Sequence, residues 1–232
     1  MTTPLRANSG GPATPLGSPR RGTAGPLRVV RHALADRLFH WIAAACVLTL
    51  LGTAFLPILG VEFPWVVVHW VSGLVLTVAV LFHIVRVLVR GTLGSMWLGR
   101  ADLADALDVA TSTLARKLPT RRPGKYSVAQ KLIHHAFAVA VLTTLITGGL
   151  MLVRVDTPWW QRNPYLLADA TWGIVFVLHG LAALLLVTMV MMHVYFALRP
   201  EKLKFTRAMI RGWITRQEFD EHHDPERWQV DR

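Results

Sequence analysis

The sequence predicts an all-α membrane protein, a bundle of four transmembrane helices with both termini on the cytoplasmic side. Two observations predict the bundle. Of the 232 residues, 53% are hydrophobic and only 17% are charged, and the apolar residues fall into four long blocks. At about 1.5 Å rise per residue, a helix of roughly 20 apolar residues crosses a hydrocarbon core of about 30 Å. The blocks cover residues 38–59, 65–85, 132–153 and 172–198.

Composition excludes several other classes of protein. The apolar content is too high for a disordered chain, and a disulfide scaffold needs more than the single cysteine, Cys46. The first apolar block begins too far from the N-terminus, and continues too long, for a cleaved signal peptide. The net charge of +11 leaves a nucleic-acid-binding protein open until the positions of the basic residues are considered.

The basic residues predict the orientation. Of the 25 Lys and Arg residues, all except Arg154 and Arg162 lie in segments that four spans place on one side of the membrane. Positive residues gather on the cytoplasmic side, so we expect a multi-pass protein of the plasma (inner) membrane with cytoplasmic N- and C-termini. The positive net charge is then explained by the orientation of the protein in the membrane. We expect the lipid bilayer as a partner and no nucleic acid.

The N-terminal part of the chain divides at residue 28. Residues 1–27 are rich in Gly, Pro, Ser, Thr and Arg, and are predicted to be a disordered basic segment. Residues 28–200 form the four-helix domain, in which the short turn at 60–64 makes the first two spans an antiparallel hairpin. Apolar residues recur at three- and four-residue steps over 102–118, which is typical of a helix lying on the membrane surface.

The second half of the chain carries two further features. Trp159, Trp160 and Tyr165 between the third and fourth spans indicate an aromatic belt at the outer interface. Residues 201–232 form a cytoplasmic tail with a short amphipathic helix, for which Thr206 is the expected N-cap. The apolar side of this helix is expected to contain Met209, Ile210, Trp213 and Ile214.

The histidines are the main candidates for a functional site. An ionisable side chain is costly in a spanning helix, so each such residue is a functional candidate. The structural alternative for any single one is a neutral histidine hydrogen-bonded between helices. Seven of the ten lie within or at the ends of the spans: His40, His69, His83, His134, His135, His179 and His193.

The spacing of these histidines favours a cofactor. His179 and His193 are 14 residues apart, as are His69 and His83. Fourteen residues of α-helix return a side chain to within about 40° of its starting direction, about 21 Å further along the axis. Two antiparallel helices with this spacing can hold two cofactors stacked across the bilayer. Neutral imidazole suits haem iron, and two axial imidazoles leave no position for oxygen, so that the iron only passes electrons.

Two other metal centres are less consistent with the sequence. A zinc site needs three or four ligands close together, usually including a carboxylate or a thiolate. Cys46 is not part of a CxxCH motif, which excludes a covalent c-type haem. Height in the membrane pairs His69 with His179. For His193, spacing alone favours neither His83 nor His40 as the partner.

Several further residues have two interpretations each. Gly148 either lets a porphyrin approach or serves helix packing. Arg37 and Arg86 either pair with haem propionates or only follow the positive-inside rule. His222 and His223 in the polar tail are interpreted as contacts to a soluble subunit rather than as metal ligands.

The motifs around these residues resemble a known family. From about Arg31 to Trp228, the chain is similar to the gamma (cytochrome b556) subunit of respiratory formate dehydrogenases. Quinone-reactive nickel–iron hydrogenases and thiosulfate reductases use related subunits. The motifs are Phe39-His40-Trp41, Val68-His69-Trp70-Val71-Ser72-Gly73, Gly124-Lys125-Tyr126-Ser127-Val128-Ala129-Gln130-Lys131, His179-Gly180, His193-Val194-Tyr195, Gly212-Trp213 and His222-His223.

The resemblance implies two b haems as cofactors. It assigns the inner haem to His40 and His193 and the outer haem to His69 and His179. This leaves His83 as an addition to the family pattern, interpreted as a hydrogen-bonded neighbour of the haem or of an arginine, with ligation the less favoured alternative.

The resemblance also implies a site for menaquinone or ubiquinone near the inner haem. This site uses the segment before the third span, where Gln130 and Lys131 match the family. The usual Asn is Ser127 here and the usual Gly is Ala129. Serine still donates one hydrogen bond to a quinone carbonyl, but with a shorter reach. The alternative for Gln130 is a loop residue that ties the segment to the membrane surface.

The chain has no cysteine cluster for iron–sulfur and no dinucleotide-binding glycine motif, so it is expected to be a non-dehydrogenase subunit of a complex. The resemblance implies an iron–sulfur subunit and a catalytic molybdopterin subunit as partners, with electrons passing through both haems to quinone. The alternatives are a subunit of a hydrogenase or thiosulfate reductase, a free-standing b-type cytochrome, and a transporter or structural anchor.

Overall fold

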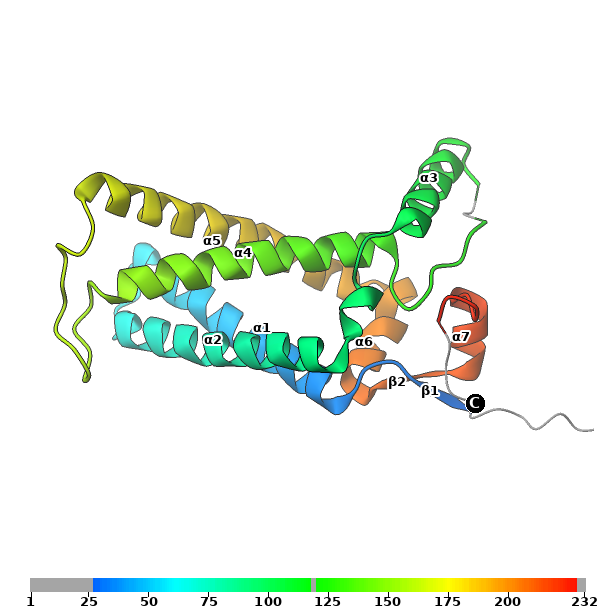
Figure 1. Cartoon of the computed structure of the whole chain (residues 1–232), viewed down its shortest axis with the longest axis horizontal. Coiled ribbons are helices and arrows are strands. Elements are labelled where there is room, and N and C mark those ends of the chain that lie inside the picture. Colours follow the sequence, from blue (N-terminus) through cyan, green and yellow to red (C-terminus); the bar gives the residue numbers. More distant parts are fainter. Residues whose placement is uncertain (1–26, 118–119, 229–232) are drawn as a thin grey trace, which may run out of the picture.

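Four long helices run side by side through the computed structural model, which describes residues 27–117 and 120–228 (Figure 1). These helices are α1 (Leu34–Phe55), α2 (Trp65–Arg90), α4 (Val128–Leu152) and α5 (Asp169–Leu198). Each is long and apolar enough to cross a membrane, which confirms the predicted four-span fold. Of the segment predicted to be disordered, residues 1–26 lie outside the described residues.

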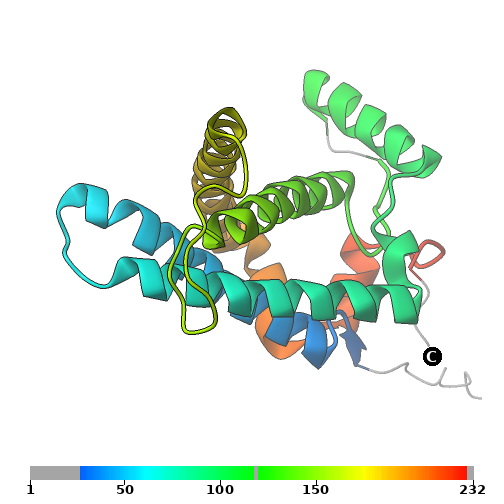
Figure 2. The same cartoon turned by 60° about the vertical axis from the view of Figure 1, so that its left-hand side comes forward.

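The four helices form two antiparallel hairpins. α1 packs mainly on α2, α4 packs mainly on α5, and a smaller contact joins α2 to α4. The first hairpin turns through a short 3-10 helix, Pro57–Leu59, and through Gly60, whose φ of 84° suits a residue without a side chain. Figure 2 shows the two hairpins inclined to each other. We call the end with these interhelical turns the loop end, and the opposite end, where the described chain begins and finishes, the terminal end.

Apolar side chains cover the outer surface of the bundle. Val78, Val89, Ile146 and Leu181 are 67%, 80%, 65% and 59% exposed. Keeping such a surface in water costs about 25 cal/mol per Å². A bilayer removes this cost, so the exposed apolar residues agree with a multi-pass membrane protein.

Two helices extend beyond the apolar blocks because of local signals. α4 begins at Val128, since the backbone N–H of Ser127 donates to Gln130 Oε1 at 2.9 Å and the Ser127 side chain accepts from the Gln130 backbone. This reciprocal capping box starts the helix one turn early. α2 continues to Arg90 and ends at Gly91, whose φ is 63°.

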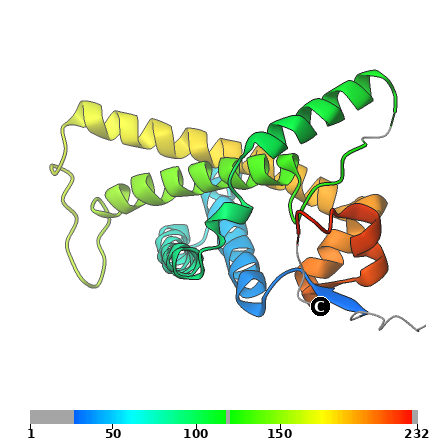
Figure 3. The same ribbon diagram turned by 45° about the vertical axis from the view of Figure 1, so that its right-hand side comes forward.

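The connection between α2 and α4 contains a 3-10 helix η2 (Thr92–Ser95) and α3 (Arg100–Leu114), which projects from the bundle (Figure 3). α3 ends before residue 118, the predicted end. Its polar side is buried, with Asp102 5% exposed, whereas Leu107 and Leu114 are 58% and 86% exposed. This outward apolar side agrees with a helix on a membrane surface, which stays a prediction.

The terminal end carries a small cap that contains a two-stranded sheet. β1 (Arg28–Val30) pairs antiparallel with β2 (Trp213–Thr215), with Val29 opposite Ile214. The chain reaches β2 from α5 through the 3-10 helix η3 (Pro200–Lys202) and α6 (Leu203–Arg211), and then forms α7 (Arg216–His222). No pattern in the sequence predicts this sheet. The apolar core of the cap is Val29, Ala208, Ile214, Phe219 and Trp228.

Two details of the predicted tail helix are wrong. α6 begins at Leu203, so Thr206 is not its N-cap but lies inside it and donates its hydroxyl hydrogen bond to the Ala197 carbonyl at 2.7 Å. Trp213 and Ile214 do not extend its apolar side, because Gly212, at a φ of 91°, ends the helix and turns the chain into β2.

His223 is buried inside the cap and joins its segments. The prediction that it contacts a soluble subunit is therefore wrong. His223 is 3% exposed, and Arg31 beside it is 2% exposed. His223 Nδ1 donates to the Gly124 carbonyl at 2.7 Å, which leaves Nε2 to accept from Arg31 Nη1 at 2.8 Å. Arg31 Nη2 also donates to the Lys125 carbonyl at 3.0 Å. Only a neutral imidazole satisfies both bonds, because a second N–H would face the guanidinium.

We expect this cap to loosen on acidification. Burial lowers the pKa of His223 to about 4, and burial lowers the pKa of His32 to about 4 as well. An unfolded histidine has a pKa of about 6.5, so the unfolded cap binds more protons between these values. The stability that neutral histidine contributes is therefore complete above about pH 6.5 and is lost as the pH falls towards 4. Hydrogen exchange of residues 213–223 in purified protein measures the loss.

His223→Gln and His222→Gln form a matched pair for this prediction. The first variant removes the buried imidazole of His223, so exchange at pH 7.5 should rise and its pH dependence should flatten. His222 is only partly buried, and its replacement should leave the profile unchanged. Equal pH profiles in His223→Gln and the unaltered protein contradict this explanation.

Candidate functional site

Two histidine pairs lie between the hairpins. Near the loop end, His69 of α2 faces His179 of α5, with ring centroids 6.3 Å apart and ring planes at 61°. Near the terminal end, His40 of α1 faces His193 of α5, with centroids 6.1 Å apart and planes at 50°. The first pair is the one that helix height predicts. For the second, the structure brings His40 rather than His83 opposite His193.

His83 has a different neighbour. Its ring stacks on Phe39, with centroids 4.0 Å apart and planes at 8°. His83 Nδ1 is buried and has no hydrogen-bond partner within the described ranges. The equal spacing of 14 residues on α2 and α5 therefore does not produce two equal pairs, because α1 supplies the ring that faces His193.

The separation of both pairs fits two axial ligands of one iron. With iron–nitrogen bonds of about 2.0 Å and each centroid about 1.1 Å behind its nitrogen, opposed imidazoles have centroids about 6.2 Å apart. The observed 6.1 Å and 6.3 Å agree with this value. Residues 27–117 and 120–228 contain no group of three or more His, Cys, Asp or Glu side chains placed to hold a metal ion alone. A porphyrin, which supplies four ligands itself, needs only two.

Two threonines contact the loop-end pair, and sequence reasoning missed both. Thr53 Oγ1 of α1 lies 2.8 Å from His69 Nδ1, and Thr147 Oγ1 of α4 lies 2.9 Å from His179 Nδ1. They are 4% and 6% exposed. A lone threonine in an apolar helix gives no signal, since it ordinarily bonds to its own helix.

The residues expected to bind quinone are engaged with other protein groups. Ser127 and Gln130 bond to each other in the capping box of α4. Lys131 Nζ lies 2.9 Å from an Asp102 carboxylate oxygen and donates to the Trp97 carbonyl at 3.0 Å. To bond to a quinone, each of these groups must therefore give up one of its present hydrogen bonds or form the new bond in addition to it.

The arginines at the terminal end also have protein partners. Arg86 of α2 forms an ion pair with Asp36 of α1, and Arg37 donates to the Ile210 carbonyl at 2.6 Å. These contacts join α1 to α2 and to α6. Nε of each arginine is nevertheless buried without a hydrogen-bond partner among the described residues, so these contacts do not use the whole of either guanidinium.

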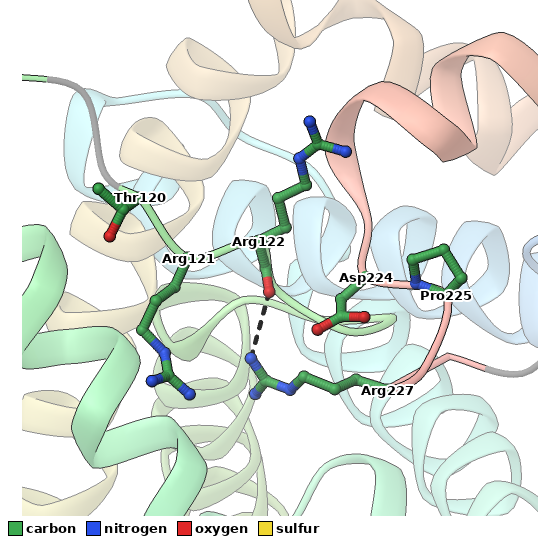
Figure 4. A pocket seen from close by; sticks show the side chains of 6 residues that line it. All are labelled: Thr120, Arg121, Arg122, Asp224, Pro225 and Arg227. Carbon is green, nitrogen blue, oxygen red and sulfur yellow. Dashed lines mark hydrogen bonds between the residues drawn. The ribbon is translucent and has the colours of Figure 1, made fainter.

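A polar pocket of about 390 Å³ lies where the loop before α4 meets the C-terminal tail (Figure 4). Two of its arginines, Arg121 and Arg227, form ion pairs with Asp105 of α3, and Arg122 donates to the Asp220 carbonyl. These bonds tie the loop before α4 to the tail. The pocket is lined by Thr120, Arg121, Arg122, Asp224, Pro225 and Arg227.

The structure has four long apolar helices, and between them imidazoles face each other at the separation expected for haem ligands. This combination defines a membrane cytochrome of the b type. Comparison with known proteins agrees. A family model described as prokaryotic cytochrome b561 matches residues 31–212. The chain therefore belongs to the prokaryotic cytochrome b561 family, and haem b is its expected cofactor.

Individual relatives are more distant. The chain is 23% identical over 215 residues to the formate dehydrogenase cytochrome b556 subunit of Haemophilus influenzae, covering 87% of this chain and 82% of the relative. It is 26% identical over 210 residues to the formate dehydrogenase cytochrome b556(fdo) subunit of Escherichia coli strain K12, covering 86% and 91%. These matches confirm the resemblance to formate dehydrogenase cytochrome b subunits.

Proposed function

We propose that the chain is the cytochrome b subunit of a respiratory formate dehydrogenase, with two b haems held by four histidines. His69 and His179 hold an outer haem near the loop end, and His40 and His193 hold an inner haem near the terminal end. The observation that carries the proposal is the pair of opposed imidazoles at each height, at separations of 6.3 Å and 6.1 Å. His179 and His193 lie about 21 Å apart along α5, which is most of the thickness of a hydrocarbon core.

The protein supplies ligands rather than reaction chemistry at these sites. The two imidazoles of each pair would hold the iron between them, and would leave oxygen and substrates no place on the metal. When bound, the two haems supply one-electron carriers that link an iron–sulfur partner outside the membrane with quinone near the cytoplasmic side. The names of the relatives support a formate dehydrogenase as the complex.

Further partners and the orientation belong to the same proposal. The complex includes an iron–sulfur subunit and a catalytic molybdopterin subunit, and menaquinone or ubiquinone is the acceptor. Both termini lie in the cytoplasm, because four spans place all the Lys and Arg residues except Arg154 and Arg162 on one side of the membrane, the side of the termini, and positive residues gather on the cytoplasmic side. Quinone binds near the inner haem and takes protons from the cytoplasm, with Ser127, Gln130 and Lys131 as the candidate contacts.

Haem content tests the proposal directly. The complex is purified from its native membranes through a tag on this chain, and its haem is extracted and compared with the amount of protein. We expect two non-covalent b haems per chain, low-spin spectra, reduction by formate and reoxidation by a quinone analogue. One haem per chain, or none, overturns the two-haem proposal. Two haems that hydrogen reduces and formate does not would identify a hydrogenase subunit instead.

Gly148 offers a further prediction about the outer site. A Cβ atom at Gly148 would lie 3.2 Å from His179 Cε1, so the imidazole must shift by a few tenths of an ångström in Gly148→Ala. We expect a lower content of the outer haem, or an altered low-spin spectrum, with the inner haem unchanged. Gly149→Ala is the matched control, because no described atom outside its own stretch of helix backbone lies within 4 Å of its Cβ position. Equal spectra for both variants would contradict the prediction.

A further inference from the structure

We propose that Thr53 and Thr147 are positioning residues that orient the two outer imidazoles and lower the midpoint potential of the outer haem relative to the inner one. This inference rests on the proposed function, because it concerns the haem held by His69 and His179. It assigns a role to two side chains that do not touch the iron. Its basis is the direction of two hydrogen bonds and the absence, among the described residues, of an equivalent bond at His40 Nδ1.

The hydroxyl protons of both threonines are committed to their own helices. Thr53 Oγ1 lies 2.9 Å from the Thr49 carbonyl oxygen, and Thr147 Oγ1 lies 2.5 Å from the Thr143 carbonyl oxygen. A carbonyl oxygen only accepts, so the single hydroxyl proton must lie between the two oxygens. If it pointed at the imidazole instead, two oxygen lone pairs would face each other at these distances.

Each hydroxyl oxygen is therefore an acceptor towards the imidazole. The Nδ1 atoms of His69 and His179, at 2.8 Å and 2.9 Å, carry the proton and donate it. Nε2 then holds the lone pair that an iron requires, so the bonds select the ligating tautomer of both rings. They also orient each ring, because each Nδ1 lies within hydrogen-bond distance of a hydroxyl oxygen on a neighbouring helix.

His40 of the inner pair lacks this support. His40 Nδ1 is buried and has no hydrogen-bond partner in the part of the chain that the structure describes. A histidine that donates from Nδ1 is a more basic ligand at Nε2, and a more basic ligand stabilises ferric over ferrous iron. The outer haem should therefore have the lower potential. Electrons that enter at the outer haem then move downhill in energy towards the inner one.

Threonine-to-valine variants test this inference. Thr53→Val and Thr147→Val keep the shape of the side chain and remove the acceptor oxygen. Thr49→Val and Thr143→Val are matched controls one turn earlier on the same helices, since each removes a hydroxyl that donates only to the carbonyl four residues before it. Thr53→Ser and Thr147→Ser retain the oxygen and should behave as the unaltered protein does.

The readouts are redox titration of each haem in the purified complex and the low-temperature electron paramagnetic resonance spectrum of the oxidised haems. We expect each valine variant to favour reduced over oxidised outer haem by about tenfold, which is an upward shift of about 59 mV for one electron. The shift should be larger in the double variant. The inner haem, the two control variants and the two serine variants should be unchanged.

The possible outcomes separate this inference from the proposed function. An unchanged outer potential in both valine variants, with two haems bound, overturns the inference and leaves the proposed function intact. Loss of the outer haem in the valine variants but not in the serine variants supports it, whereas loss in the serine variants as well overturns it. Fewer than two haems in the unaltered protein refutes the proposed function itself.

Discussion

Replacement of His179 by alanine should remove the outer haem and leave the inner one in place, so that the haem content falls from two to one per chain. His69→Ala should have the same effect, because a single remaining imidazole in a spanning segment holds iron poorly and no described group of three or more His, Cys, Asp or Glu side chains is placed to hold a metal. Transfer of electrons from donor to quinone should be lost in both variants. Haem extraction with reduced-minus-oxidised spectra measures the first effect, and reduction of a quinone analogue measures the second.

The controls for this prediction separate ligand loss from general damage. His134→Ala removes a histidine of α4 that stands beside His135 rather than in either opposed pair, and should retain both haems. In His179→Gly, free imidazole added during haem reconstitution should restore the outer haem, because the small ligand occupies the space of the missing ring. Retention of both haems in either His69→Ala or His179→Ala shows that this pairing is wrong.

The architecture of the spans could be predicted because length and apolar content alone determine it. The helix ends could not be placed as well, because they depend on single residues. Ser127 starts α4 through its capping box, and Gly91 ends α2. The pairing of β1 with β2 was missed for a different reason. Each strand has three residues, and almost the whole chain separates them, so no local pattern marks either one.

The candidate site was predictable in part. Spacing on α2 and α5 identified the histidines that matter, since a helical repeat determines which side chains share a direction. It did not decide between His40 and His83, because that depends on how α1 sits against α2, which the turn between them sets. His223 was misinterpreted because its polar sequence neighbours suggest exposure, whereas Arg31 and the Gly124 carbonyl bury it from distant parts of the chain.

The second large effect is expected at the inner pair, in a comparison of His40→Ala with His83→Ala. The His40 ring faces His193 at 6.1 Å, whereas the His83 ring lies flat on Phe39 at 4.0 Å. Loss of a ligand empties the site or leaves the iron five-coordinate, while loss of a neighbouring ring changes its potential only modestly. We therefore expect His40→Ala to abolish the inner haem signal and His83→Ala to keep both haems, with the inner potential shifted.

The two variants are best compared in one preparation of membranes, with each haem followed by redox titration and by its low-spin signal. His40→Ala should also stop reduction of quinone, because the electron then has no carrier near the terminal end. In His83→Ala, the stacking partner of Phe39 is lost, but the His40 and His193 imidazoles remain opposed. The reverse outcome, with the inner haem lost only in His83→Ala, requires α2 and α5 to hold both haems. α1 would then serve only in packing, and the proposed role of His40 would be wrong.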